Sequence, residues 1–186
     1  VGGTWVEKIA KSYQNGAWVD WWNNELYTPG NEWSGVTGGW YGLPWKIMSS
    51  ATAAETIKVD RGASGIKMYF EATSGRRSAV LVTANKIDLS DYNTLTFNGC
   101  INLNGTIDPS YGKPYGAVYI FENLNGTYYD TNTSYAAKSE NISNTGTNGD
   151  VTLDISGLSG SYYVGVSLYT FDAPNASLEM NSMMLS

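Results

Sequence analysis

The sequence predicts an all-β protein, an antiparallel β-sandwich of jelly-roll type, and three observations support this prediction. Several short segments after residue 54 alternate apolar and polar residues with a period of two, as half-buried strands do. Residues that favour turns, above all glycine and asparagine, separate these segments. Charged residues make up only 15% of the 186 residues. This composition is typical of a sandwich or barrel and differs from that of a helical bundle or a disordered chain.

The N-terminal 24 residues are expected to form an arm or a short helix that packs on the domain formed by residues 25–186. Thr4 and Glu7 have the spacing of a capping box, which is common at helix starts. Four apolar residues then fall on one helical face, and a glycine could end the turn: Val6, Ile9, Ala10 and Tyr13, followed by Gly16. The alternative is an extended arm, because a helix this short is marginal.

The strands are expected in the remainder of the chain. Residues 26–45 are interrupted by glycine and proline and indicate loops with short strands. After them come segments with strand periodicity or continuous apolar runs: 66–70, 78–83, 94–97 leading into 100–103, 116–122, 151–155, 162–169 and 178–180. Residues 105–113 and 123–150 are expected to form long loops, and a hairpin within the second of them is the alternative. The predicted core includes Cys100, Leu153, Val164 and Val166.

The charge distribution excludes some partners. The chain has 11 basic and 17 acidic residues and a formal net charge of −6, whereas phosphate recognition needs clustered lysine and arginine. The basic pair Arg76-Arg77 is predicted to lie in a solvated turn. No nucleic acid partner is therefore expected. No membrane span is expected either, since the longest apolar runs reach four or five residues.

The sequence offers little for catalysis. It contains no histidine, which removes the commonest general base and zinc ligand. The single cysteine, Cys100, lies in a predicted strand and is expected to pack rather than react. Asp20, Glu25 and Glu32 lie among tryptophans, an environment that raises a carboxyl pKa, but no carboxylate pair with the spacing of a glycosidase is recognisable. We therefore do not expect this protein to be an enzyme.

All seven tryptophans lie within the first 45 residues. They either form a small core that holds the N-terminal segment or present flat indole faces to a ligand such as a sugar ring. Neighbouring glycines favour the second interpretation for part of the run, and a proline- and glycine-rich loop supplies further rings. The candidate ligand-binding residues are Trp33, Trp40, Tyr41 and Trp45, with Glu32 beside them, and Tyr111 and Tyr115 in the later loop.

Three stretches together resemble a known group of modules: residues 26–40 (LYTPGNEWSGVTGGW), 86–99 (KIDLSDYNTLTFNG) and 150–169 (DVTLDISGLSGSYYVGVSLY). The chain from about Glu25 onward resembles β-sandwich modules of tail and minor structural proteins from phages and prophages of Gram-positive hosts. Those modules are similar to jelly-roll carbohydrate-binding modules. The resemblance implies a place on a virion or an extracellular surface and a polysaccharide or cell-surface glycan as partner. It carries no catalytic signature.

The resemblance also implies that one structural calcium ion could be bound, because similar jelly rolls often carry one. Without histidine, the ligands must be oxygen atoms. Asp60, Asp172 and Glu179 are the candidate metal ligands, and the alternative is that these acids are simply solvated. No other cofactor is indicated.

Two functions remain open at this point. One is a non-catalytic, carbohydrate-binding-module-like domain of a phage tail, receptor-binding or secreted surface protein. The other is a structural virion or oligomerisation domain, for example in a homotrimer, whose tryptophans are buried at an interface. Aromatic residues are enriched in both settings, so the tryptophan run does not separate them. A glycoside hydrolase is a third and weaker alternative.

Overall fold

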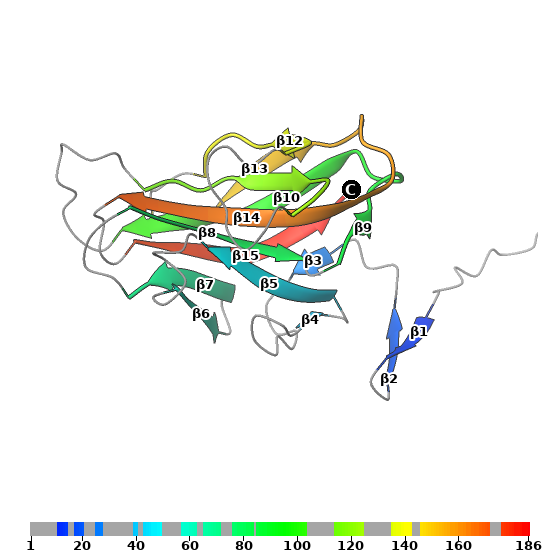
Figure 1. Cartoon of the computed structure of the whole chain (residues 1–186), viewed down its shortest axis with the longest axis horizontal. Helices are drawn as coiled ribbons and strands as arrows, with labels where there is room; N and C mark the ends of the chain where they lie inside the picture. The colour runs from blue at the N-terminus through cyan, green and yellow to red at the C-terminus, as the bar shows by residue number, and fades with distance from the viewer. Residues whose placement is uncertain are drawn as a thin grey trace, which may run out of the picture.

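The computed structural model describes the backbone of residues 11–14, 17–20, 25–27, 39–40, 43–49, 57–62, 65–71, 76–83, 85–103, 114–124, 135–142, 146–171 and 176–186, and most side chains from Ile57 onward. All regular elements in these residues are β-strands, arranged mainly in two antiparallel sheets that face each other (Figure 1). The prediction of an all-β sandwich is confirmed. The described residues contain no helix long and apolar enough to cross a membrane.

A separate hairpin precedes the sandwich (Figure 1). Strand β1 (Lys11–Gln14) pairs antiparallel with β2 (Ala17–Asp20), and Tyr13 is in register with Trp18. The predicted helix is therefore wrong for residues 11–14, where the extended alternative holds. Asn15-Gly16 is the dipeptide most favoured in two-residue hairpin loops, and this local preference outweighs the helical spacing of a few apolar residues. The capping-box residues Thr4 and Glu7 lie outside the described part of the chain.

The six-stranded sheet has the order β13-β10-β15-β7-β6, and β3 pairs with the far end of β15. Its strands are β3 (Glu25–Tyr27), β6 (Ile57–Gly62), β7 (Gly65–Phe70), β10 (Thr94–Leu103), β13 (Gly149–Asp154) and β15 (Ala176–Leu185). Strand β15 contains a bulge: its register with β10 passes from Ser182 opposite Asn98 to Met180 opposite Gly99, which leaves Asn181 as the extra residue.

The seven-stranded sheet has the order β12-β11-β14-β8-β5-β4, and β9 pairs with the start of β14. Its strands are β4 (Gly39–Trp40), β5 (Leu43–Ser49), β8 (Arg76–Thr83), β9 (Ile87–Asp88), β11 (Val118–Phe121), β12 (Ala137–Lys138) and β14 (Ser161–Phe171). From β7 onward the long strands alternate between the two sheets, with β7, β10, β13 and β15 in one and β8, β11 and β14 in the other. This alternation is the connectivity of a jelly roll.

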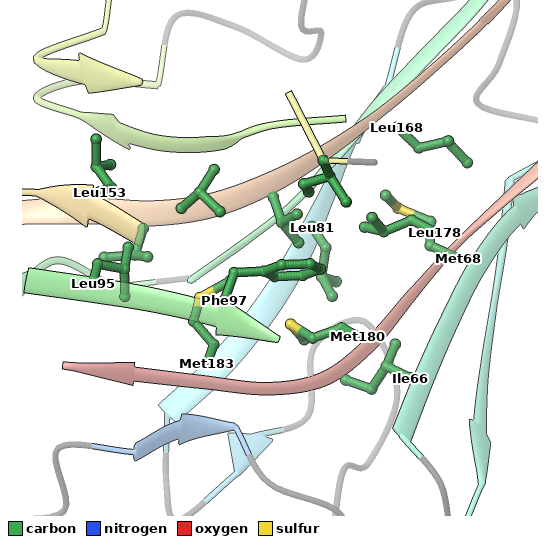
Figure 2. Packing of buried hydrophobic residues seen from close by; sticks show 14 of the residues in the cluster. Ile66, Met68, Leu81, Leu95, Phe97, Leu153, Leu168, Leu178, Met180 and Met183 are labelled. Carbon is green, nitrogen blue, oxygen red and sulfur yellow. The ribbon is translucent and has the colours of Figure 1, made fainter. Parts of the chain in front are cut away.

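The main core lies between the sheets. Side chains from both sheets point toward one another there, with Phe97 of β10 and Leu81 of β8 among the largest that are fully buried (Figure 2). The predicted core residues are confirmed as buried: Cys100, Leu153, Val164 and Val166. Residues 78–83 form the predicted central strand, since β8 pairs with β14 on one side and β5 on the other.

The pair Arg76-Arg77 is not in a turn, which corrects the prediction from sequence. Both residues belong to β8 and are in register with Phe171 and Thr170 of β14. The strand begins two residues before the apolar run that identified it, because the pairing with a long partner strand extends the ladder beyond the hydrophobic residues. Charged side chains at a strand end leave no periodic signal in the sequence.

Two matching turns close one end of the sandwich. Asp88 accepts hydrogen bonds from the hydroxyl and the backbone N–H of Ser90 at 2.7 and 3.0 Å, and Asp154 accepts the same pair from Ser156 at 2.7 and 3.0 Å. The first turn is also bonded to the segment that follows the second, since the N–H of Gly160 donates to the Ser90 hydroxyl at 2.8 Å. The two turns are the Asp-x-Ser parts of two of the three stretches that carried the family resemblance.

We expect these two turns to make the domain sensitive to acid. The side-chain and then the backbone hydrogen bonds from Ser90 and Ser156 lower the pKa of Asp88 and Asp154. A carboxyl pKa that is lower in the folded state stabilises the fold above the unfolded pKa of about 3.9, and this contribution disappears as the pH falls through the folded pKa. Melting temperatures at pH 6 and pH 3 should therefore differ less in D88N/D154N than in the unmodified protein. E122Q, at an exposed carboxyl outside both turns, is the control. If the difference between the two melting temperatures fell equally in E122Q, the assignment to the two turns would be contradicted.

Candidate functional site

The outer faces of the two sheets differ in their exposure. On the seven-stranded sheet, the side chains that alternate with the core residues form a second buried cluster: Val80 and Val82 of β8 with Ala117, Tyr119 and Phe121. The Tyr119 and Phe121 rings stack with centroids 5.5 Å apart. Since these side chains are at most 3% exposed, the middle of this face does not offer a surface to a ligand.

Tyr115, a predicted ligand-binding residue, lies on this same face toward one end. It forms an isolated bridge with Tyr169 of β14, and the two half-buried rings stack with centroids 4.7 Å apart and an interplanar angle of 26°. Tyr111, its predicted companion, lies outside the described residues.

Of the predicted tryptophan set, the structure describes only the backbones of Trp40 and Trp45. Trp40 is in β4 and Trp45 in β5, and their side chains are not among those that the structure describes. Glu32, Trp33 and Tyr41 lie outside the described residues. Trp45 is in register with Thr83, whereas Tyr115 is in register with Tyr169. The strand register puts their backbones about five residues apart along the strands and three strands apart across the sheet, roughly 17 Å and 14 Å. The backbones of Trp45 and Tyr115 are therefore too far apart to lie against one small ligand.

The six-stranded sheet, by contrast, carries a broad polar outer face. We call the polar face the outward residues of β6, β7, β15, β10 and β13. In one row across the strands stand Lys58, Tyr69, Ser177 and Asn102, and in the next stand Asp60, Lys67, Glu179 and Cys100. Beyond the bulge the rows continue with Asn181, Ser182, Asn98, Asp150, Met184, Thr96, Thr152, Thr94 and Asp154.

Hydrogen bonds fix the side chains of the polar face in place. The Asn181 amide donates to Asn98 at 3.2 Å, and the Asn98 amide donates to Asp150 at 2.6 Å, so that a chain of polar groups runs from β15 across β10 to β13. On the other half of the face, Asn102 donates to Glu179 at 3.4 Å. Amide and carboxylate groups held in this way present donors and acceptors at fixed positions, which lowers the entropic cost of binding a polar ligand.

Tyr69 is the aromatic ring of the polar face. It is half-buried, and the Lys67 ammonium lies 5.7 Å from the ring centroid while also pairing with Glu179 at 3.9 Å. Burial raises the pKa of the Tyr69 phenol, and the hydrogen bond to Asp60 and the negative charges of Asp60 and Glu71 raise it further. The phenol therefore stays neutral at physiological pH and can donate to a carboxylate.

Two small side chains fill the middle of the polar face. Cys100 and Ser177 are each only 1% exposed, although the alternation along β10 and β15 puts them opposite the core residues Ile101 and Leu178. Burial and then the charge of Glu179 raise the pKa of the Cys100 thiol, so that the reactive thiolate is disfavoured. The expectation that Cys100 packs rather than reacts agrees with this environment.

The predicted calcium ligands are only partly described. Asp60 and Glu179 flank Lys67 in the same row, and the Lys67 ammonium, 3.9 Å from Glu179, opposes a second cation there. The described residues contain no group of three or more cysteine, aspartate or glutamate side chains that could hold a metal ion. Asp172 lies outside the described residues, so a calcium site that includes it stays a prediction.

Reasoning from sequence did not single out the polar face as a site. The alternation of Ile66, Met68 and Phe70 with Lys67, Tyr69 and Glu71 did indicate one wet face of β7, and the structure confirms it. Asn98, Asn102 and Asn181 carried no such signal, because they become neighbours only through the pairing of distant strands.

No protein-family model matches the chain, and no curated protein matches its sequence. Solved structures of carbohydrate-binding modules and of a glycoside hydrolase are similar to it in fold at low sequence identity. A domain of the Endo-D glycoside hydrolase from Streptococcus pneumoniae gives a TM-score of 0.50 at 10% identity over 77% of this chain and 22% of that chain. A family 29 carbohydrate-binding module from Piromyces equi gives 0.49 at 9% identity over 87% of each chain. A family 6 module from Clostridium stercorarium, in complex with cellobiose, gives 0.42 at 12% identity over 74% of this chain and 85% of that chain.

At these identities the likenesses concern the fold alone. In this chain the long strands alternate between two antiparallel sheets. The chain is an antiparallel β-sandwich with the connectivity of a jelly roll.

Proposed function

We propose that the chain is a non-catalytic carbohydrate-binding domain whose glycan lies across the polar face. The observation that carries the proposal is the array of hydrogen-bonded amides and carboxylates on the outer face of the six-stranded sheet, which also carries the half-buried ring of Tyr69. Sugar hydroxyls both donate and accept hydrogen bonds, and the C–H face of a sugar packs on an aromatic ring.

The direction of the glycan follows from the arrangement of these groups. Tyr69 and Asn102 stand in the same row, separated by the small residue Ser177, and the chain from Asn181 to Asp150 runs parallel to that row. Adjacent strands are about 4.8 Å apart, so the row from Lys58 of β6 to Asn102 of β10 spans roughly 14 Å, and Asn98 lies four residues, roughly 13 Å, from Asn102 along β10. An extended oligosaccharide running diagonally across the strands, from Tyr69 toward Asp150, would contact both halves of the polar face.

We expect Y69A to weaken glycan binding by about tenfold or more, since removal of an interaction worth about 1.4 kcal/mol has that effect. The melting temperature should change little, because Tyr69 is not part of the core between the sheets. Affinity electrophoresis in gels that contain neutral polysaccharides, with calorimetry for the best ligand, measures the first effect, and a thermal melt measures the second.

Y135A is the matched control, because Tyr135 is 47% exposed and lies in the sequence just before β12 of the other sheet. It should bind as the unmodified protein does. If Y69A binds normally while W40A loses binding and keeps its melting temperature, the glycan site is the predicted tryptophan set instead.

We further propose an extracellular or virion-surface location, where such a domain would meet polysaccharides. The polar face supports this location, because its amides and carboxylates can bind the hydroxyl groups of a polysaccharide. The competing role, a structural trimer, predicts that the purified domain elutes at three times its 20.2 kDa mass and fails to bind every glycan in a panel.

A further inference from the structure

The polar face is acidic. Among the described residues it carries four carboxylates, Asp60, Asp150, Asp154 and Glu179. Glu71 adds a fifth at the end of β7, where it pairs with Lys58. Against the two ammonium groups of Lys58 and Lys67, three formal negative charges remain. The two lysines are already paired with carboxylates of the same face, Lys58 with Glu71 at 3.4 Å and Lys67 with Glu179 at 3.9 Å.

The remaining carboxylates accept hydrogen bonds from neutral groups. Asp150 accepts from the Asn98 amide, Asp154 from Ser156, and Asp60 is hydrogen-bonded with Tyr69. These bonds do not neutralise the charge, so Asp60 near one edge of the sheet and Asp150 and Asp154 at the other edge keep the face negative over its width.

We infer that the polar face selects against acidic glycans, so that uronic-acid and phosphate-bearing polymers are excluded and the ligand is a glycan without acidic groups. The inference rests on the proposed function of this face. The physical cause is repulsion: a polyanion laid across the sheet brings its charges within about one Debye length, roughly 8 Å at physiological ionic strength, of several carboxylates. Discrimination of this kind works by penalising the wrong ligand rather than by improving contacts to the right one.

The test compares one polymer with its own acidic derivative. Hydroxyethylcellulose, barley β-glucan, galactomannan and potato galactan are screened by affinity electrophoresis, and any that binds is then oxidised at its primary alcohols to carboxylates. We expect the oxidised polymer to bind at least about tenfold more weakly at low salt. Binding should recover partly at about 0.5 M NaCl, since salt screens repulsion. If binding weakened only because the oxidation removes a hydrogen-bonding hydroxyl, added salt would not restore it.

Two double variants assign the effect to the polar face. D60N/D150N removes two negative charges from the polar face, and each new amide keeps an acceptor oxygen. We define the penalty as the affinity for the neutral polymer divided by the affinity for its oxidised form. In D60N/D150N this ratio should fall at least about threefold. E122Q/E140Q removes two exposed charges associated with the other sheet and should leave the penalty unchanged. Equal shifts in both variants, or equal binding of the neutral and the oxidised polymer, would overturn the inference. If no neutral polymer binds, the proposed function itself fails.

Discussion

V166D should abolish folding. Val166 is fully buried in β14, at the centre of the seven-stranded sheet, where it is in register with Val118 of β11 on one side and Leu81 of β8 on the other. All three side chains belong to the core between the sheets. An unpaired carboxylate at this position costs several kcal/mol, which is comparable to the roughly 5–15 kcal/mol stability of a whole domain. Expression in soluble form, circular dichroism and a thermal melt measure the outcome.

The same change on an exposed strand position provides the control. Thr152 is exposed on β13, in register with Thr96, and T152D should fold and melt cooperatively with a loss of less than about 1 kcal/mol. A soluble V166D protein with a cooperative melt would show that Val166 is not buried between the sheets.

The sandwich was predictable because its strands carry their own signal. The alternation of Ile66, Met68 and Phe70 with polar neighbours corresponds to the buried and half-buried positions of β7. Strand β14 differs: its alternation of Val164, Val166 and Leu168 with small or polar residues predicts one wet face, but both faces are buried along its middle. The second face is buried because it lies beside the second cluster, whose residues come from β8, β11 and the segment before β11. The sequence of β14 alone does not show that these neighbours are present.

The polar face was not predictable because it depends on the register between distant strands. Asn102 and Glu179 are 77 residues apart in sequence, and Asn98 and Asn181 are 83 apart. The dense tryptophan run, by contrast, is a local feature and therefore draws attention first. Glu179 was identified from sequence as a possible metal ligand, whereas the structure shows it paired with a lysine and an asparagine on the polar face. The acidic residue type indicated a polar contact at this position, but the sequence did not predict which residues make that contact.

Glycine at position 65 links the stability of the fold to the geometry of the polar face. Gly65 opens β7 with φ of 135°, a conformation that residues with a side chain rarely adopt. A methyl group on it would meet the Met180 carbonyl oxygen and approach the Cα of Asn181 at 3.3 Å. These atoms belong to the bulge of β15, which positions Asn181 to donate to Asn98.

We therefore expect G65A to destabilise the domain by about 2–4 kcal/mol, because backbone strain and a clash with a neighbouring strand add together. Glycan binding measured well below the melting temperature should fall as well, since β15 must move and Asn181 with it. G149A is the control: Gly149 lies on the edge strand β13, where an added methyl group meets nothing within 4 Å. Urea denaturation should show a lower midpoint for G65A and an unchanged midpoint for G149A. Equal midpoints for G65A and the unmodified protein would mean that the bulge yields without cost and does not fix the amides of the polar face.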